Sequence, residues 1–135
     1  MQTKIMMTFS AAVLAVLGLA FTFLPDELAV YLGSEPGPLD VLLLQMAGAL
    51  YLGFAMLNWM AKGTLIGGIY NRPICLANFG HFFIGTMAMF KFLFRYPEQP
   101  FVLWILCAAY AGFAAWFGLT LYRHPLPVKE EKVKA

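Results

Sequence analysis

The chain has 135 residues, of which 61% are hydrophobic and only 12% are charged. Ordinary soluble domains carry roughly a quarter charged residues, so this composition excludes a typical water-soluble domain and indicates a membrane protein. The formal net charge of +2 is too small to indicate nucleic acid as a partner.

Four apolar stretches are each long enough to cross a hydrocarbon core, which needs about 20 helical residues. We therefore predict an all-α integral membrane protein, a four-transmembrane-helix bundle over residues 1–124, with the remaining residues 125–135 forming a charged cytoplasmic tail. The expected helices lie near 5–24, 40–61, 73–94 and 101–122.

The first stretch ends at Pro25, Asp26 and Glu27, which neither continue a helix comfortably nor remain in lipid. We interpret it as a membrane span and not as a cleaved signal peptide, because it exceeds the usual apolar run and lacks a clean A-x-A site. The next residues, near 26–33, predict a short interfacial segment. Asp40 is expected at the start of the second span.

Basic residues are unevenly distributed between the two ends of the expected helices. Cytoplasmic loops are enriched in Lys and Arg, so the side with more of them is expected inside. With both termini in the cytoplasm of an inner-membrane protein, seven basic residues lie inside and two outside: Lys4, Lys62, Arg72, Arg123, Lys129, Lys132 and Lys134 against Lys91 and Arg95.

The third expected helix is the most informative. Asn78 and His81 fall on one arc, which predicts a polar stripe facing the bundle. Polar side chains in hydrocarbon are costly unless paired, and they are often functional. The partners expected for His81 are Asn78 and Asn58, and Tyr51 and Tyr110 could approach it from the second and fourth helices. Two alternatives stay open for His81: a strut between helices, hydrogen-bonded to an asparagine or tyrosine, or a role in ligand, proton or substrate handling. Four phenylalanines form a separate arc expected to face lipid: Phe79, Phe83, Phe90 and Phe94.

We expect a non-enzymatic protein that binds a small apolar or weakly polar ligand, such as a lipid or quinone, within the bundle. Membrane lipid and a second copy of the chain are the other expected partners. The alternatives are a channel or transporter subunit and a lipid-modifying enzyme that uses a buried histidine. The candidate ligand-binding residues are His81, Asn78, Asn58, Gln45, Tyr51 and Tyr110.

The residues that several classes of membrane protein need for their chemistry are missing from this sequence. No metal-ligand set and no pair of nucleophile and base stands out, and no cofactor is identified. Proton-coupled exporters of the small four-helix type need a membrane-embedded carboxylate, which is missing once Asp40 starts a helix. Cys75 and Cys107 form no CxxC pair, and we expect them to be separate buried thiols.

The segments Gly48 to Trp59 and Arg72 to Asn78 resemble the middle helices of small bacterial membrane proteins of the DoxX-like kind. The likeness covers about a third of the chain and consists of glycine-rich helix packing. It implies the four-helix fold, and it implies no catalytic residue.

Overall fold

The computed structural model describes residues 2–64 and 69–122, and the charged tail expected at 125–135 lies outside them. Four of the described helices are long and apolar enough to cross a membrane, which confirms the predicted all-α, four-span fold class. Their ends lie within about one turn of the expected ranges. The elements are α1 (Gln2–Phe23), α2 (Pro25–Tyr31), α3 (Pro38–Ala61), the 3-10 turn η1 (Ile69–Asn71), α4 (Arg72–Arg95) and α5 (Phe101–Tyr122).

The connection between α1 and α3 is ordered by local turn chemistry. Pro25 occupies the first turn of α2, where its missing N–H costs no hydrogen bond. Gly33 follows α2 with a φ of +80°, a conformation that side chains disfavour, and it lets Ser34 N–H donate to Ala29 O at 2.9 Å. Gly37 N–H then donates to the Asp40 carboxylate at 2.9 Å. Asp40 therefore lies in the first turn of α3, as expected, and its carboxylate caps the start of that helix.

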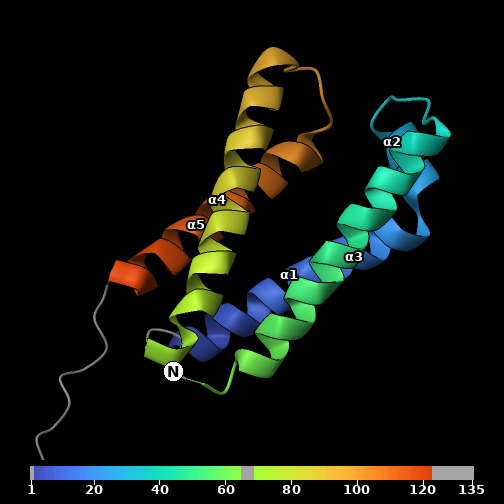
Figure 1. Cartoon of the computed structure of the whole chain (residues 1–135). Coiled ribbons are helices and arrows are strands. Elements are labelled where there is room, and N and C mark those ends of the chain that lie inside the picture. Colours follow the sequence, from blue (N-terminus) through green and yellow to red (C-terminus); the bar gives the residue numbers. More distant parts are fainter. Residues whose placement is uncertain (1, 65–68, 123–135) are drawn as a thin grey trace, which may run out of the picture.

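The long helices form two antiparallel pairs, α1 with α3 and α4 with α5 (Figure 1). Gly18 and Gly48 mark the closest approach of α1 and α3. A Cβ at Gly18 would lie 2.9 Å from Leu52 N, and a Cβ at Gly48 would lie 2.9 Å from Gly18 O. Helices in lipid associate by such close packing of small residues, because lipid is as apolar as their side chains.

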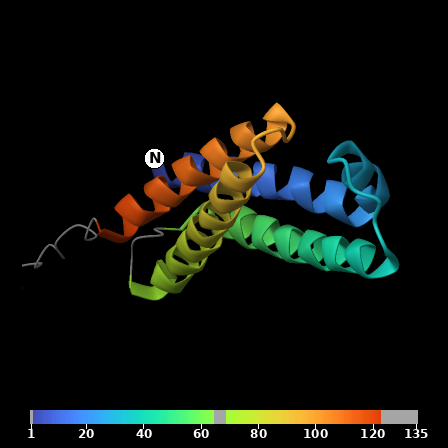
Figure 2. The ribbon, with the colours of Figure 1, turned by 90° about the horizontal axis from the view of Figure 1, so that it is seen from above.

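The α4–α5 pair is packed through aromatic rings and crosses at an open angle (Figure 2). Phe82 is fully buried and lies against Tyr110, Phe113 and Phe117, with ring centroids 5.0, 4.9 and 5.8 Å away. Of the four phenylalanines expected to face lipid, Phe79 is only partly buried and packs beside Gly118, while the others are exposed. Phe82, which the sequence pattern did not single out, is the aromatic centre of this pair.

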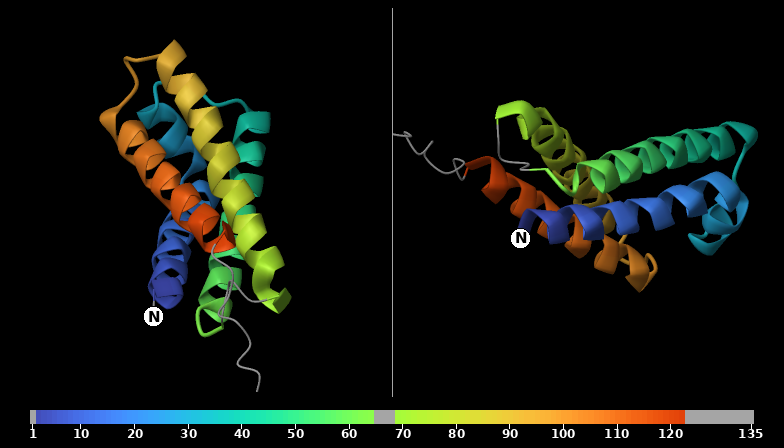
Figure 3. Two further views of the ribbon diagram at one scale, coloured as in Figure 1. Left: turned by 90° about the vertical axis from the view of Figure 1, so that its left-hand side faces the viewer. Right: turned by 90° about the horizontal axis from the view of Figure 1, so that it is seen from below.

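The two pairs come together near the end of the molecule where α1 begins and diverge toward the other end (Figures 1 and 3). At the meeting end Met6 is buried, and Thr120 O–H on α5 donates to its Sδ at 3.8 Å. Beyond this region α3 and α4 separate. The candidate site lies where the separation begins.

Candidate functional site

Two of the predicted site residues bind each other across α3 and α4. Asn58 Nδ2 donates to Asn78 Oδ1 at 2.7 Å, and Asn78 Nδ2 donates to Asn58 Oδ1 at 2.8 Å. Both side chains are fully buried. A reciprocal amide pair of this kind satisfies one donor and the acceptor of each residue, so it joins the two helical pairs by a directional contact.

The second N–H of each amide is also used. Asn58 donates to Ser10 Oγ on α1 at 3.0 Å, and Asn78 donates to Ile74 O in its own helix at 2.9 Å. Ser10 O–H in turn donates to Met7 O at 3.1 Å. The polar junction, defined as Ser10, Asn58 and Asn78, thus has its amide donors and acceptors occupied and connects three helices.

His81 lies one turn along α4 from Asn78, among aromatic rings. Its imidazole stacks on Phe54 with a centroid distance of 4.9 Å and an interplanar angle of 26°. Tyr51 approaches it edge-on at 5.2 Å, and Tyr110 lies at 5.7 Å. The histidine ring is therefore held between α3 and α5 by packing.

The hydrogen bond expected between His81 and an asparagine does not form. His81 Nε2 is buried and has no hydrogen-bond partner among the described residues. The physical reason is that the two asparagines use their groups on each other, on Ser10 and on Ile74. A buried polar atom without a partner costs about 1–3 kcal/mol, and native structures keep few of them.

A groove of about 580 Å³ opens beside this histidine. We call it the His81 groove. Its volume falls within the range of roughly 300–1,000 Å³ that small-molecule sites occupy. Three helices line it: Tyr51 and Phe54 from α3, Ala77, Gly80, His81, Ile84 and Gly85 from α4, and Tyr110 from α5.

The predicted site residues therefore divide into three groups. His81, Tyr51 and Tyr110 are brought together in the His81 groove. Asn58 and Asn78 form the polar junction next to it. Gln45 is exposed on α3 and does not line the groove, so its role in ligand binding stays a prediction.

Sequence reasoning did not propose Phe54 for the site, and it considered Ser10 only as an available nucleophile in the enzyme alternative. Phe54 was detectable, because Tyr51, Phe54 and Asn58 follow helical spacing along one face of α3. The indication for Ser10 was weaker. It lies on α1 among Met6, Met7 and Leu14, which are buried in the structure. A lone serine in an apolar helix gives no indication of which helix it will meet.

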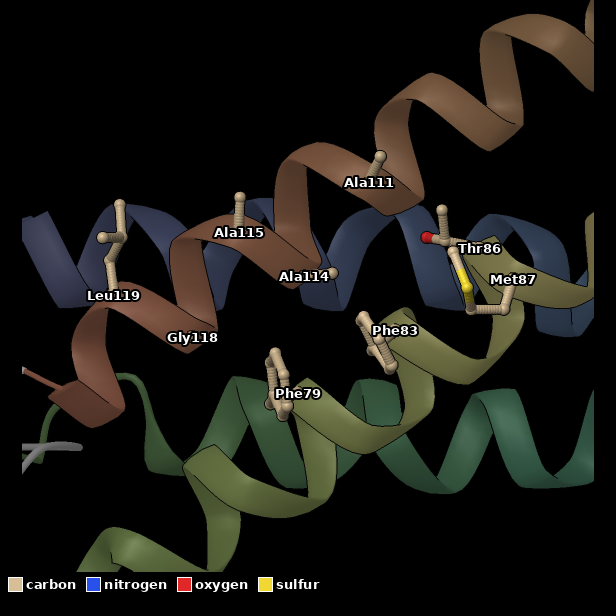
Figure 4. Close-up of a pocket in the computed structure, with 9 residues that line it drawn as sticks. All are labelled: Phe79, Phe83, Thr86, Met87, Ala111, Ala114, Ala115, Gly118 and Leu119. Carbon is tan, nitrogen blue, oxygen red and sulfur yellow. The ribbon is translucent and has the colours of Figure 1, made fainter. Parts of the chain in front are cut away.

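A second groove of about 540 Å³ lies between α4 and α5 (Figure 4). Phe79 and Phe83 on α4 face small residues of α5, including Ala114 and Gly118. The polar side chain that lines this second groove is Thr86, and its hydroxyl already donates a hydrogen bond to Phe82 O at 2.7 Å. The surface is otherwise apolar, so it offers shape without a free polar group.

The described segments, residues 2–64 and 69–122, contain neither a set of metal ligands nor a disulfide. Within them no three His, Cys, Asp or Glu side chains gather as a ligand set. Cys75 and Cys107 are both buried and free, which confirms the expected separate thiols. Cys75 Sγ lies 3.5 Å from Phe117 O, and Cys75 does not line the His81 groove.

Comparisons with known proteins returned no match: no protein-family model, no curated protein and no solved structure is similar to this chain.

Proposed function

We propose that this multi-pass membrane protein binds a small, weakly polar ligand from the lipid phase, such as a lipid or a quinone, in the His81 groove. One observation carries the proposal: His81 Nε2 is buried and finds no hydrogen-bond partner in residues 2–64 and 69–122, whereas the neighbouring asparagine amides are fully paired. A polar head that reaches this nitrogen would remove the cost of the unpaired atom. His81 itself is partly exposed and lines the groove, so a ligand seated there would lie next to the imidazole.

Binding is favoured over catalysis by what surrounds the histidine. A general base needs a nucleophile within hydrogen-bond reach. The hydroxyl of Ser10 is committed to Met7 O, and the thiol of Cys75 lies against Phe117 O. The side chains packed on the imidazole are aromatic, and its partners are Tyr51, Phe54, Phe82 and Tyr110. This environment suits an apolar ligand with one polar contact.

Binding is also favoured over conduction. A pathway through the bundle would need a continuous lining of polar groups. The polar junction instead closes the region between α1, α3 and α4 with side chains that bind one another. The groove beside it is lined mainly by aromatic and small apolar residues.

The membrane setting is part of the proposal. We place the protein in the cytoplasmic membrane with both termini inside, because Lys4, Lys62 and Arg72 lie at the end of the molecule where α1 begins. Lys62 lies over the Trp59 ring at 2.9 Å, a pairing suited to a membrane interface. The large exposed apolar surface of the helices is compatible with self-association, and we propose a homo-oligomer.

Native mass spectrometry of gently extracted protein tests ligand binding directly. We expect a copurified small molecule, and we expect its occupancy to fall about tenfold in His81→Phe, which keeps an aromatic ring but removes the nitrogen; a tenfold change corresponds to about 1.4 kcal/mol. Met46→Leu, on an exposed position of α3 outside the groove, is the matched control. Equal occupancy in His81→Phe, or no bound mass after incubation with a membrane lipid extract, would contradict the proposal.

A further inference from the structure

The floor of the His81 groove contains an unusual glycine. A Cβ built at Gly80 meets no atom within 4 Å, although Gly80 is partly buried. The other described glycines with such open surroundings are exposed to the outside of the molecule, and these are Gly33, Gly53, Gly63 and Gly112. Gly80 is thus the one described glycine that combines partial burial with a free space above it.

Packing within the protein explains Gly85 but not Gly80. A Cβ at Gly85 would come within 2.9 Å of the Tyr110 ring, so this position must be small for α4 and α5 to meet. No such neighbour exists at Gly80, and glycine in the interior of a helix lowers its stability relative to alanine. A role that fits this free space is close approach of a ligand to the backbone of α4.

The residues around the free space above Gly80, which we call the recess, present flat surfaces. Ala77 and Gly80 present almost no side chain, and the stacked rings of His81 and Phe54 stand beside them. The polar side chains of the lining are His81, Tyr51 and Tyr110, and His81 Nε2 is the buried atom among the described residues that lacks a partner here. Planar rings pack best on surfaces of this kind, with centroid separations of about 4.5–7 Å.

We infer that the ligand of the His81 groove presents a flat ring with an oxygen at its edge, the ring lying over Gly80 and the oxygen directed to His81. The inference rests on the proposed function and specifies the chemical class of its ligand. A quinone head and a sterol-like fused ring share this chemistry. An open acyl chain does not, since it has no planar face to place against the glycine.

Gly80→Leu separates this arrangement from folding, because the added side chain would enter the recess without meeting protein atoms at its Cβ. The matched control is Gly53→Leu, at an open glycine of α3 outside the groove. We expect Gly80→Leu to weaken binding of decylubiquinone or cholesterol at least tenfold in nanodiscs, with no fall in melting temperature. Gly53→Leu should bind like the unmodified chain. The relative affinities of the two probes then distinguish a quinone from a sterol.

Monoolein, which carries an oxygen head on an acyl chain, distinguishes the possible failures. If monoolein binds in a manner that His81→Phe abolishes while neither ring probe binds, the flat-ring inference is overturned and the proposed function stands. If none of the three probes binds, both are overturned. If a ring probe binds equally to Gly80→Leu, the ring does not lie over Gly80 and the inference is wrong.

Discussion

Asn58 on α3 and Asn78 on α4 exchange hydrogen bonds of 2.7 and 2.8 Å in the buried region where the two helical pairs meet. The helices around this contact bury mostly apolar groups, for which the surrounding lipid is an equally good environment. Directional bonds therefore contribute more to how α3 and α4 are placed than apolar contact does.

Removing both asparagines should cost less than the sum of the two single removals. Asn78→Ala leaves one N–H and the carbonyl oxygen of the Asn58 amide without partners in an apolar interior. We expect a loss of about 1–2 kcal/mol in the free energy of unfolding. The double variant Asn58→Ala with Asn78→Ala leaves no unpaired amide and should cost less than the sum of the two single alanine changes. Unfolding of the unmodified protein, the two single variants and the double variant in detergent, followed by circular dichroism, measures this double-mutant cycle. Strictly additive losses would show that the pair is not coupled.

The spans were predictable because their requirement is simple. A hydrocarbon core needs about 20 apolar residues in a helix, and residues such as Pro25 and Asp40 mark where the helix must leave it. The four-span class follows from these limits alone.

The contacts inside the bundle were predictable only in part. The sequence identified Asn58, Asn78 and His81 as the polar residues that matter, but it assigned the asparagines to His81 and not to each other. That choice depends on the rotation of α3 and α4, which is fixed in part by Ser10 on α1. The missed role of Phe82 has the same origin, because lipid and protein interior offer a phenylalanine nearly the same environment.

The glycines of the α1–α3 contact should differ sharply from the exposed glycine on the same helix. A Cβ at Gly48 would lie 2.8 Å from Thr22 N and 2.9 Å from Gly18 O, and backbone atoms cannot move aside independently. Gly48→Ala should therefore separate α1 from α3 and cost about 1–3 kcal/mol of stability.

Gly53→Ala provides the control for Gly48→Ala, since nothing lies within 4 Å of a Cβ there. Alanine has a higher helix propensity than glycine, so Gly53→Ala should leave the free energy of unfolding unchanged or raise it by up to about 1 kcal/mol. Its melting temperature should therefore stay the same or rise slightly. Thermal unfolding of both variants in the same detergent measures the contrast. Equal melting temperatures for the two variants would place the α1–α3 contact elsewhere.

The cysteines should react only when the fold opens. Cys75 is fully buried and Cys107 nearly so, and both are free. A maleimide should label neither thiol within the time needed to label Ser34→Cys completely, because Ser34 is exposed in the α2–α3 connection. Denaturation in hot dodecyl sulfate should then expose both. Rapid labelling of native Cys75 would mean that the end of the bundle where α4 begins opens in solution.

The proposed orientation can be tested with reporters placed on opposite sides of the membrane. A green fluorescent protein fused after residue 135 should fluoresce, because this reporter folds in the cytoplasm, whereas alkaline phosphatase at the same position should be inactive. Phosphatase inserted at Glu98, in the α4–α5 turn, should be active and serves as the control. The reverse pattern would contradict the orientation. The positive charges are its cause, so Lys62→Gln combined with Arg72→Gln should produce a mixed population, while Lys91→Gln combined with Arg95→Gln should not.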